Sequence, residues 1–453
     1  METVQRRKKR ALFSFLHDNR SFLLGILLIL SAYIKFIYVF HYTAYENYLV
    51  SDMKAYWDAA VESYYHGDFD PGQWSTLPTL GHLLLVWVFK LLYLADLYPY
   101  KLEIVVGINI LLSTLNVALV YGIAMRIFPS GGYGLVVAAL DAFFFPIAFS
   151  DALILPIHPY LFSLLVSTYM IVAYHDRGKL YLFISGVMLG VSVALRPETA
   201  SMILPFLAYP MSTSDRPTKG VWHSLIFAFG LGSILLLVIA QNNAVSSGKL
   251  RAPSADTAPK YLLEVCQQDI ITSQSDTGTF TLRRHSLSPS MPQREYNTTI
   301  PFAQQSRLFA HAQTCKKSAR TLLKAFIQKI HRIYQDTVSE ILPPYHPSII
   351  NVLRFNTLAL WLSGLLILLP FVVYDRRIAR STVILLIGTA ASHLIALFAF
   401  GIEPCFLQGF FYVVVLLSVL SVIAVLSQLK RLWWRVGIYL LIIGGAIMLF
   451  DRL

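Results

Sequence analysis

Long apolar runs recur along this chain, and they restrict its possible folds more than any other feature. A transmembrane helix needs about 20 consecutive apolar residues. Runs of roughly that kind occupy residues 21–40, 104–127, 131–149, 155–174, 180–195, 198–211, 222–242, 351–374, 381–400, 405–427 and 433–450. Charged residues make up only 14% of the 453 positions, against about 25% in soluble domains. The sequence therefore predicts an all-α polytopic membrane protein.

The positive charge of the chain indicates its orientation in the membrane and does not indicate nucleic-acid binding. The formal net charge is +12, but the basic residues fall in short connectors between apolar runs, as the positive-inside rule describes. These connectors are Arg6–Arg10, Arg126, 175–179, 214–220, 374–380 and 428–435. The first apolar run has no small-residue cleavage site after it, so we interpret it as a retained span rather than a signal peptide.

One apolar stretch, residues 80–96, decides the orientation. If it crossed the membrane, the basic N-terminus and the later basic connectors would lie on opposite sides. If it lies in the interface, all the basic connectors share the cytoplasmic side. We therefore predict about 11 transmembrane helices, a cytoplasmic N-terminus and two short spans within 180–211 that meet at "LRPE". The segments expected on the non-cytoplasmic face are 41–103, 150–158, 196–198, 243–350 and 401–405.

The chain divides into three parts by composition. Residues 1–242 form the predicted transmembrane core, including a first external loop at 41–103, and residues 351–453 form C-terminal transmembrane helices. Between them, 243–350 is a long polar, non-cytoplasmic loop that ends in an amphipathic helix at 320–334. Cys266 and Cys315 both fall in this loop and could form a disulfide or stay as free thiols.

Several ionisable residues fall at predicted span ends on the non-cytoplasmic face. They are Asp52, Asp151, His158, Arg196, Glu198 and Glu403. Ionisable groups at a membrane boundary are costly unless they are solvated or paired, so this group predicts a shared polar cavity. Each residue also has an ordinary explanation. Asp52 could cap a helix, and Arg196 could extend to lipid headgroups.

A series of short motifs follows the predicted spans in order. Asp52, Tyr56 and Ala59 or Ala60 form a "D…Y…A" pattern after the first span. The later motifs are "WSTLPTLGHLLLVW" (74–87), "YGIAMRIFPSG" (121–131), "FFPIAFSDALILPIHP" (144–159), "SGVMLGVSVALRPET" (185–199) and "EPCF" (403–406). Each motif is loose, so the information lies in their order and in its agreement with the charge-derived topology.

This order resembles the GT-C glycosyltransferases, above all the branch of protein O-mannosyltransferases and lipid A aminoarabinose transferases. The resemblance covers roughly 20–250 and, more weakly, 301–410. It implies a GT-C fold and transfer of a sugar from a polyprenyl-phosphate-linked donor, with inversion, on the non-cytoplasmic face. The acceptor could be a lipid, a glycan or a protein. A bacterial inner membrane is the favoured location over the endoplasmic reticulum.

The resemblance also assigns roles to residues of the predicted cavity. Asp52 takes the position of the catalytic carboxylate and would act as the general base, and Arg196 is the preferred partner of the donor phosphate. Asp58 and Glu62 are expected one and two helical turns after Asp52 on a similar face, and they are alternative bases. The expected substrate-binding residues are Lys54, Tyr56, Trp57, Asp151, His158, Arg196, Glu198 and Glu403.

The chain departs from the family pattern at several positions. Met53 follows Asp52 where many relatives have a second acid, and Cys405 and Phe406 replace a late Arg-Tyr pair. The loss of acids disfavours a divalent metal; if one binds, Asp151 and His158 are the expected ligands. No other cofactor is predicted. A catalytically inactive relative is one alternative, and a lipid or solute transporter is another, because polar groups beside a broken helix also suit a carrier.

Overall fold

The computed structural model describes residues 19–43, 45–48, 51–66, 79–127, 131–143, 150–214 and 216–245, together with 385, 388 and 389. The elements within these ranges are helical. They are α2 (Arg20–Ile37), η1 (Tyr38–Tyr42), η2 (Tyr45–Tyr48), α3 (Ser51–His66), α4 (Thr79–Leu94), η3 (Tyr98–Tyr100), α5 (Lys101–Ile127), α6 (Gly131–Ala142), α8 (Ile157–Arg177), α9 (Lys179–Leu195), η4 (Pro197–Met202), α10 (Ile203–Thr213) and α11 (Pro217–Val245).

Four helical segments in the described part are long and apolar enough to cross a membrane. They are Arg20–Tyr42, Tyr98–Arg126, Ile157–Arg177 and Pro217–Ala240. This confirms the prediction of an all-helical membrane protein. The predicted runs after 350 lie outside the described residues except for positions 385, 388 and 389, so the predicted total of eleven helices stays a prediction.

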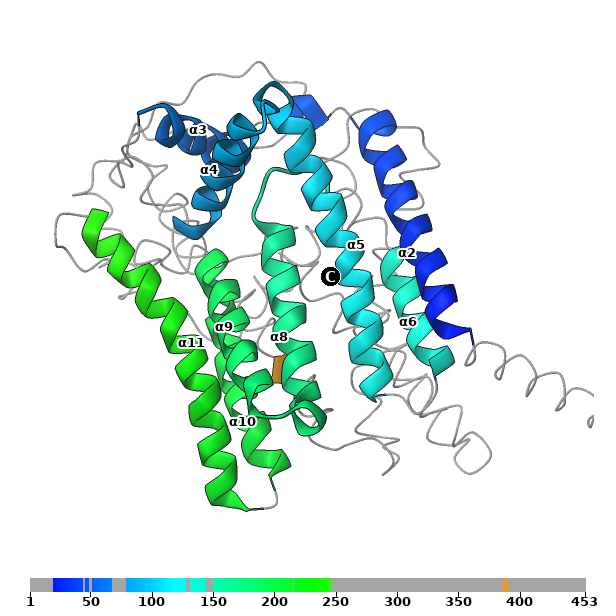
Figure 1. Ribbon diagram of the computed structural model, residues 1–453, viewed down its shortest axis with the longest axis vertical. Coiled ribbons are helices and arrows are strands. Elements are labelled where there is room, and N and C mark those ends of the chain that lie inside the picture. The colour runs from blue at the N-terminus through cyan, green and yellow to red at the C-terminus, as the bar shows by residue number, and fades with distance from the viewer. Residues whose placement is uncertain are drawn as a thin grey trace, which may run out of the picture.

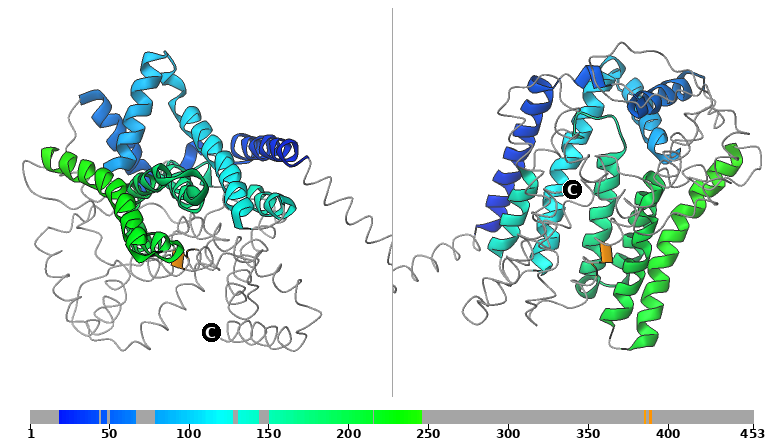
Figure 2. Two further views of the ribbon diagram at one scale, coloured as in Figure 1. Left: turned by 60° about the horizontal axis from the view of Figure 1, so that its bottom comes forward. Right: turned by 180° about the vertical axis from the view of Figure 1, so that it is seen from behind.

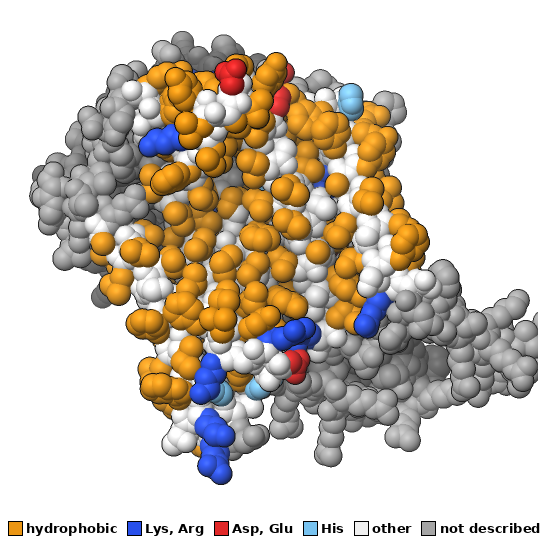
Figure 3. All heavy atoms as spheres, in the orientation of Figure 1, with side chains coloured by type: hydrophobic (Ala, Val, Ile, Leu, Met, Phe, Trp, Pro, Cys, Tyr) orange, Lys and Arg blue, Asp and Glu red, His pale blue; other side chains and the backbone are white. Residues whose placement is uncertain are grey.

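The helices pack as two adjoining groups, and successive long helices run in opposite directions (Figures 1 and 2). One group contains α2, α5 and α6, and the other contains α8, α9, α10 and α11; α5 packs against α8 and joins them. The connector at Arg126 and the turns at Arg177–Lys179 and Arg216–Lys219 all fall at one end of the bundle, which we call the basic end. In Figure 3, most Lys and Arg side chains on the visible face lie at that end. The charge pattern predicted this grouping; which side of a membrane the basic end faces stays a prediction.

The opposite end, which we call the site end, carries α3 and α4 (Figure 1). Helix α4 covers most of the stretch predicted to lie in the interface, and its apolar part, Leu83–Leu94, is shorter than the four candidate spans. Its Lys90 side chain is exposed. These features are compatible with an interfacial helix, and its placement along the membrane surface stays a prediction.

The segment predicted as two short spans is indeed broken. Helix α9 ends at Leu195, and Arg196 is extended, with φ −142° and ψ 92°. Pro197 cannot donate a backbone hydrogen bond and disfavours a helical conformation at the residue before it, which explains the break. Elsewhere, α6 ends at Ala142, before the predicted limit of its run, and 144–149 lie outside the described residues.

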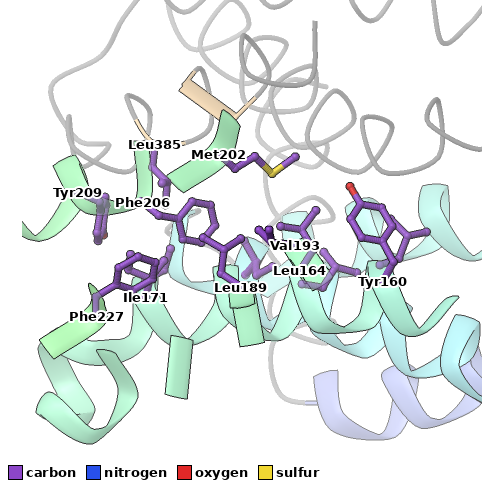
Figure 4. Close-up of a cluster of buried hydrophobic side chains, with 14 of the residues drawn as sticks. Tyr160, Leu164, Ile171, Leu189, Val193, Met202, Phe206, Tyr209, Phe227 and Leu385 are labelled. Carbon is purple, nitrogen blue, oxygen red and sulfur yellow. The ribbon is translucent and has the colours of Figure 1, made fainter. Parts of the chain in front are cut away.

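The main hydrophobic core lies between α8, α9, α10 and α11 (Figure 4). Phe206 of α10 and Phe227 of α11 are fully buried, with ring centroids 6.1 Å apart. Leu385 packs against the same cluster. Within it, Ser167 of α8 and Ser185 of α9 each donate to the carbonyl of the other, which requires the two backbones to run close together. The core therefore fixes α9 between α8 and α11.

Glycines allow α9 and α11 to cross in direct backbone contact. A β-carbon at Gly186 would collide with the carbonyl oxygen of Phe227 and lie 2.8 Å from the nitrogen of Leu231. A β-carbon at Gly230 would collide with the carbonyl oxygen of Phe183. Gly232, on the same helix as Gly230, has nothing within 4 Å of that position. Small residues at such crossings let membrane helices pack closely.

We expect Gly186→Ala to destabilise the protein, because the added methyl group forces two helix backbones apart. Overpacking of this kind costs about 1–3 kcal/mol. Thermal unfolding of the purified protein in detergent should show a midpoint several degrees lower, and Gly230→Ala should behave alike. Gly232→Ala is the matched control and should leave the midpoint unchanged. Equal midpoints for Gly186→Ala and Gly232→Ala would show that the crossing is not this close.

A buried polar cluster ties the other group of helices together. Lys35 of α2 is 1% exposed, and its Nζ donates to Ser113 Oγ of α5 over 2.6 Å. Asp141 of α6 is 3% exposed, and the charge of Lys35 acts on its carboxylate. The sequence analysis assigned no role to these residues, although each is a polar group inside an apolar run. Buried ionic groups of this kind are costly unless they are paired.

Candidate active site at one end of the bundle

Helix α3 begins where the sequence placed its candidate base. Asp52 lies in the first turn of α3, Ser51–His66, while its side chain lies outside the described part. Tyr56 is 5% exposed, and Ala59 is fully buried. An α-helix has about 3.6 residues per turn, so position 52 shares one helical face with 56 and 59. Asp52 therefore starts the face of α3 that turns toward the rest of the protein.

Tyr56 connects that face of α3 to α4 and to the turn before α8. A β-carbon at Gly81 would lie 2.9 Å from Cε1 of Tyr56 and 3.3 Å from Cγ of Pro156. The two rings thus meet at Gly81, where the absence of a side chain leaves room for both. This contact brings the start of α3 next to the 150–156 turn, which lies about 100 positions later in the sequence.

The 150–156 turn and the start of α8 hold a buried pair of ionisable side chains. His158 Nε2 lies 3.0 Å from Asp151 Oδ1, and both side chains have no exposed surface. The same nitrogen lies 3.2 Å from Ser150 Oγ. Asp151 Oδ2 and His158 Nδ1 have no hydrogen-bond partner among the described residues. Buried polar atoms are normally satisfied, so the partners of these two atoms lie outside the described residues.

Helix α5 and two apolar contacts fix this turn in place. Asn109 Nδ2 donates to the carbonyl oxygens of Asp151 and Leu153, over 3.3 and 3.0 Å. Ala152 packs into a cluster with residues of η1 and α5, and Ile154 packs into a second cluster with residues of α3 and α4. The backbone around Asp151 is therefore held from three sides, which positions its carboxylate.

Arg196 lies at the same end because α8 and α9 form an antiparallel pair. Ser192 Oγ donates to the carbonyl of Tyr160 over 3.0 Å, so the last turn of α9 lies beside the first turn of α8. Arg196 follows one turn later and is partly exposed. Thr199 Oγ1 donates to the Arg196 carbonyl over 2.6 Å and stabilises the bend that follows.

Among the remaining predicted site residues, the structure describes the side chains of Trp57 and Lys54. Trp57 is half-buried and makes an edge contact with Phe89, with centroids 4.9 Å apart. Lys54 is exposed and lies across α3 from Tyr56. Glu198 lies in η4, but its side chain is outside the described part, and all of Glu403 is outside it.

Asp58, one of the two alternative bases, does not share the face of Asp52. The sequence analysis grouped Asp58 and Glu62 with it, but in helix α3 Asp58 comes two residues after Tyr56 and falls on the other side of the helix from it, whereas Glu62 comes three residues after Ala59 and shares its side. Glu62 is exposed, and Asp58 is partly exposed. A spacing of six residues is more than one and a half turns of a helix, so Asp58 turns away from the position of Asp52.

Other polar residues at the site end were not identified from the sequence. Ser150 and Asn109 contact the Asp151–His158 pair or its backbone. The Oε2 atom of Glu103 is buried without a hydrogen-bond partner among the described residues. Burial, followed by the charges of Glu103 and Glu46, raises the pKa of the Tyr45 phenol, so Tyr45 stays protonated. The sequence feature that could have identified them is the presence of Glu103 and Asn109 near the start of the apolar run 104–127.

The described residues do not by themselves make a metal site. Asp151 and His158 supply two donors, and no group of three His, Cys, Asp or Glu residues suited to an ion occurs in the described part. The two donors also contact each other directly. A divalent metal held by Asp151 and His158 stays a prediction.

Comparisons with known proteins support the fold. No family model matches the chain, and no curated protein matches it by sequence. Among solved structures, it is similar to the archaeal oligosaccharyltransferase AglB from Archaeoglobus fulgidus in complex with an inhibitory peptide and a dolichol-phosphate. The TM-score is 0.50 at 14% identity, over 95% of this chain and 55% of that chain.

A second similar structure is the Archaeoglobus fulgidus oligosaccharyltransferase tethered to an acceptor peptide containing the NVT sequon. Its TM-score is 0.50 at 13% identity, over 96% of this chain and 55% of that one. The present chain thus spans about half the length of both. At this identity the likeness shows the fold alone, which this chain shares with these oligosaccharyltransferases. The resemblance to the GT-C glycosyltransferases and to one branch of them stays a prediction.

Proposed function

We propose that this protein is a membrane glycosyltransferase of the GT-C type that works at the site end of the bundle. It transfers a sugar from a polyprenyl-phosphate-linked donor to an acceptor hydroxyl, with inversion. The observation that carries this proposal is that Tyr56 and Pro156 both pack against Gly81. This packing brings α3, with Asp52 in its first turn, next to the turn that holds the buried Asp151–His158 pair.

The transfer needs one base. The acceptor oxygen attacks the anomeric carbon, its proton passes to the Asp52 carboxylate, and the bond between that carbon and the phosphate oxygen breaks. A positioned carboxylate contributes roughly 10²–10⁴-fold in such a step. Position 52 lies in the first turn of α3, where the helix dipole favours a carboxylate over the neutral acid. One direct displacement inverts the configuration at the anomeric carbon.

The leaving polyprenyl phosphate carries negative charge that must be stabilised. Arg196 stands at the end of α9, beside the start of α8 where His158 lies. A guanidinium matches phosphate geometry and stays charged at all working pH values. We assign Arg196 as the phosphate partner, with His158 as a second donor. Asp151 holds the His158 ring in place.

The donor class draws support from the similar structure, since that oligosaccharyltransferase was solved with a dolichol-phosphate and a peptide. A lipid-linked donor also fits a site at the end of a membrane bundle. The acceptor is a lipid, a glycan or a protein hydroxyl. We place the site on the non-cytoplasmic side of a bacterial inner membrane, with the N-terminus in the cytoplasm, because the basic end then follows the positive-inside rule.

Purified full-length protein incubated with a polyprenyl-phosphate donor carrying a radiolabelled sugar tests this function. We expect label to move into a membrane extract that supplies the acceptors, with release of polyprenyl phosphate. A carrier would move the lipid across a proteoliposome membrane without transferring label, and an inactive relative would do neither. Either of those results would overturn the proposal.

A further inference from the structure

We propose that the basic end of the bundle contains a binding site for the headgroup of an anionic phospholipid. The site lies between the turn joining α8 to α9 and the turn joining α10 to α11. We call it the headgroup patch and define it by Arg177, Lys179, Arg216, Lys219 and His223. It is at the end of the protein opposite to Asp52, and the proposed glycosyl transfer does not use it.

Side-chain contacts hold the two turns together. Tyr174 Oη lies 2.7 Å from Thr213 Oγ1, which links the end of α8 to the end of α10. The Tyr174 ring also meets the ring of His223 on α11, with centroids 5.6 Å apart. His223 Nδ1 lies 3.3 Å from Ser214 Oγ. The patch therefore has a fixed framework and is more than a group of separate surface charges.

The charges of the two turns converge on His223. Lys179 comes from one turn and Lys219 from the other, and the charges of both act on the His223 ring. Both lysines are exposed, as are Arg177 and Arg216. Basic side chains from two separate connectors thus lie near His223 at the basic end, where Figure 3 shows blue side chains gathered.

The patch has an excess of positive charge. Asp176 forms an ion pair with Arg126, with the two atoms 2.5 Å apart, so its charge is already neutralised. Asp215 lies between the described residues Ser214 and Arg216, and its own placement is outside the described part. Counted from the sequence, these two connectors hold four Lys and Arg residues against two acids. An anionic ligand fits this balance.

Exposed apolar side chains beside the charges favour a lipid as the source of the anion. Leu180 is 65% exposed, Trp222 is 59% exposed, and Met211 is 52% exposed. Tryptophan is enriched where membrane helices meet the headgroup layer. A phosphodiester between the lysines would have its acyl chains directed along α11, whose Leu225 and Phe229 are also exposed.

Native mass spectrometry of the full-length protein, titrated with phosphatidylglycerol, tests the site. We expect Lys179→Gln combined with Lys219→Gln to weaken binding roughly 30-fold, since each basic residue near an anionic lipid surface contributes a factor of roughly five. The double Lys→Arg variant should retain binding. Arg20→Gln is the control, because Arg20 is an exposed cation at the start of α2, away from the patch, and should leave binding nearly unchanged.

Several outcomes would overturn the proposal. If Arg20→Gln weakens lipid binding as much as each lysine substitution does, the lipid is attracted by the overall surface charge and not by a specific site. Equally tight binding of phosphatidylcholine would exclude an anionic headgroup as the ligand. Displacement of the lipid by soluble glycerol phosphate at similar concentration would identify a site for free phosphate. If the Lys→Gln pair does not fold, Arg177→Gln with Arg216→Gln provides the same comparison.

Discussion

Asp52→Asn should lower the rate of sugar transfer by about 10²–10⁴-fold, the usual contribution of a general base. Asparagine keeps the shape of the side chain and can still cap a helix, but it cannot accept a proton from the acceptor hydroxyl. The protein should therefore insert and fold as before. Initial rates of label incorporation, measured per amount of folded protein, give the comparison directly.

Asp58→Asn is the matched control for this prediction. It makes the same chemical change in the same helix, but on the side of α3 turned away from Tyr56. We expect it to keep most of the activity. Full activity in Asp52→Asn would mean that Asp52 only caps α3. Loss of activity in Asp58→Asn alone would place the base on the other face of the helix.

Lys35→Met should destabilise the protein, because it removes the positive charge that acts on the buried Asp141 carboxylate. Removing one partner of a contacting buried charge pair costs about 3–5 kcal/mol, which is the upper end of the expected loss. The Lys35 amine is also the donor to Ser113, which links α2 to α5. Thermal unfolding in detergent and protease resistance should both show the loss. Asp141→Asn should be destabilising for the complementary reason.

The double variant Lys35→Met with Asp141→Asn tests whether the two side chains interact with each other or stabilise the protein independently. If the two residues interact, removing both charges should restore part of the stability that either single change removes. Lys90→Met, at an exposed position on α4, is the control and should have little effect. A double variant with the summed loss of the two single ones would show that Lys35 and Asp141 are independent.

The membrane architecture could be predicted because it depends on local composition. Apolar length predicted the four long helices of the described part, and the basic connectors predicted that their ends would group as they do. The break at Arg196–Pro197 was predicted from the same charge pattern, and proline chemistry explains it in the structure. These properties are set by residues close together in the chain, so they are visible in the sequence.

The internal contacts of the site could not be predicted in the same way. His158 and Asp151 were both singled out, but their direct contact depends on the turn that Asn109 holds from another helix. The interaction between Lys35 and Asp141 depends on how α2 and α6 pack against α5. Helical register also corrected the grouping of Asp58 with Asp52, because both lie in one helix and six residues separate them.

The most direct test of the central claim is the location of a bound donor. A cryo-electron microscopy structure with a non-hydrolysable polyprenyl-phosphate sugar should show the phosphate beside Arg196 and His158. The sugar should lie toward the first turn of α3, with the Asp52 carboxylate within hydrogen-bond reach of the acceptor position. A donor phosphate bound at the basic end, or on the outer surface of α11, would contradict the account.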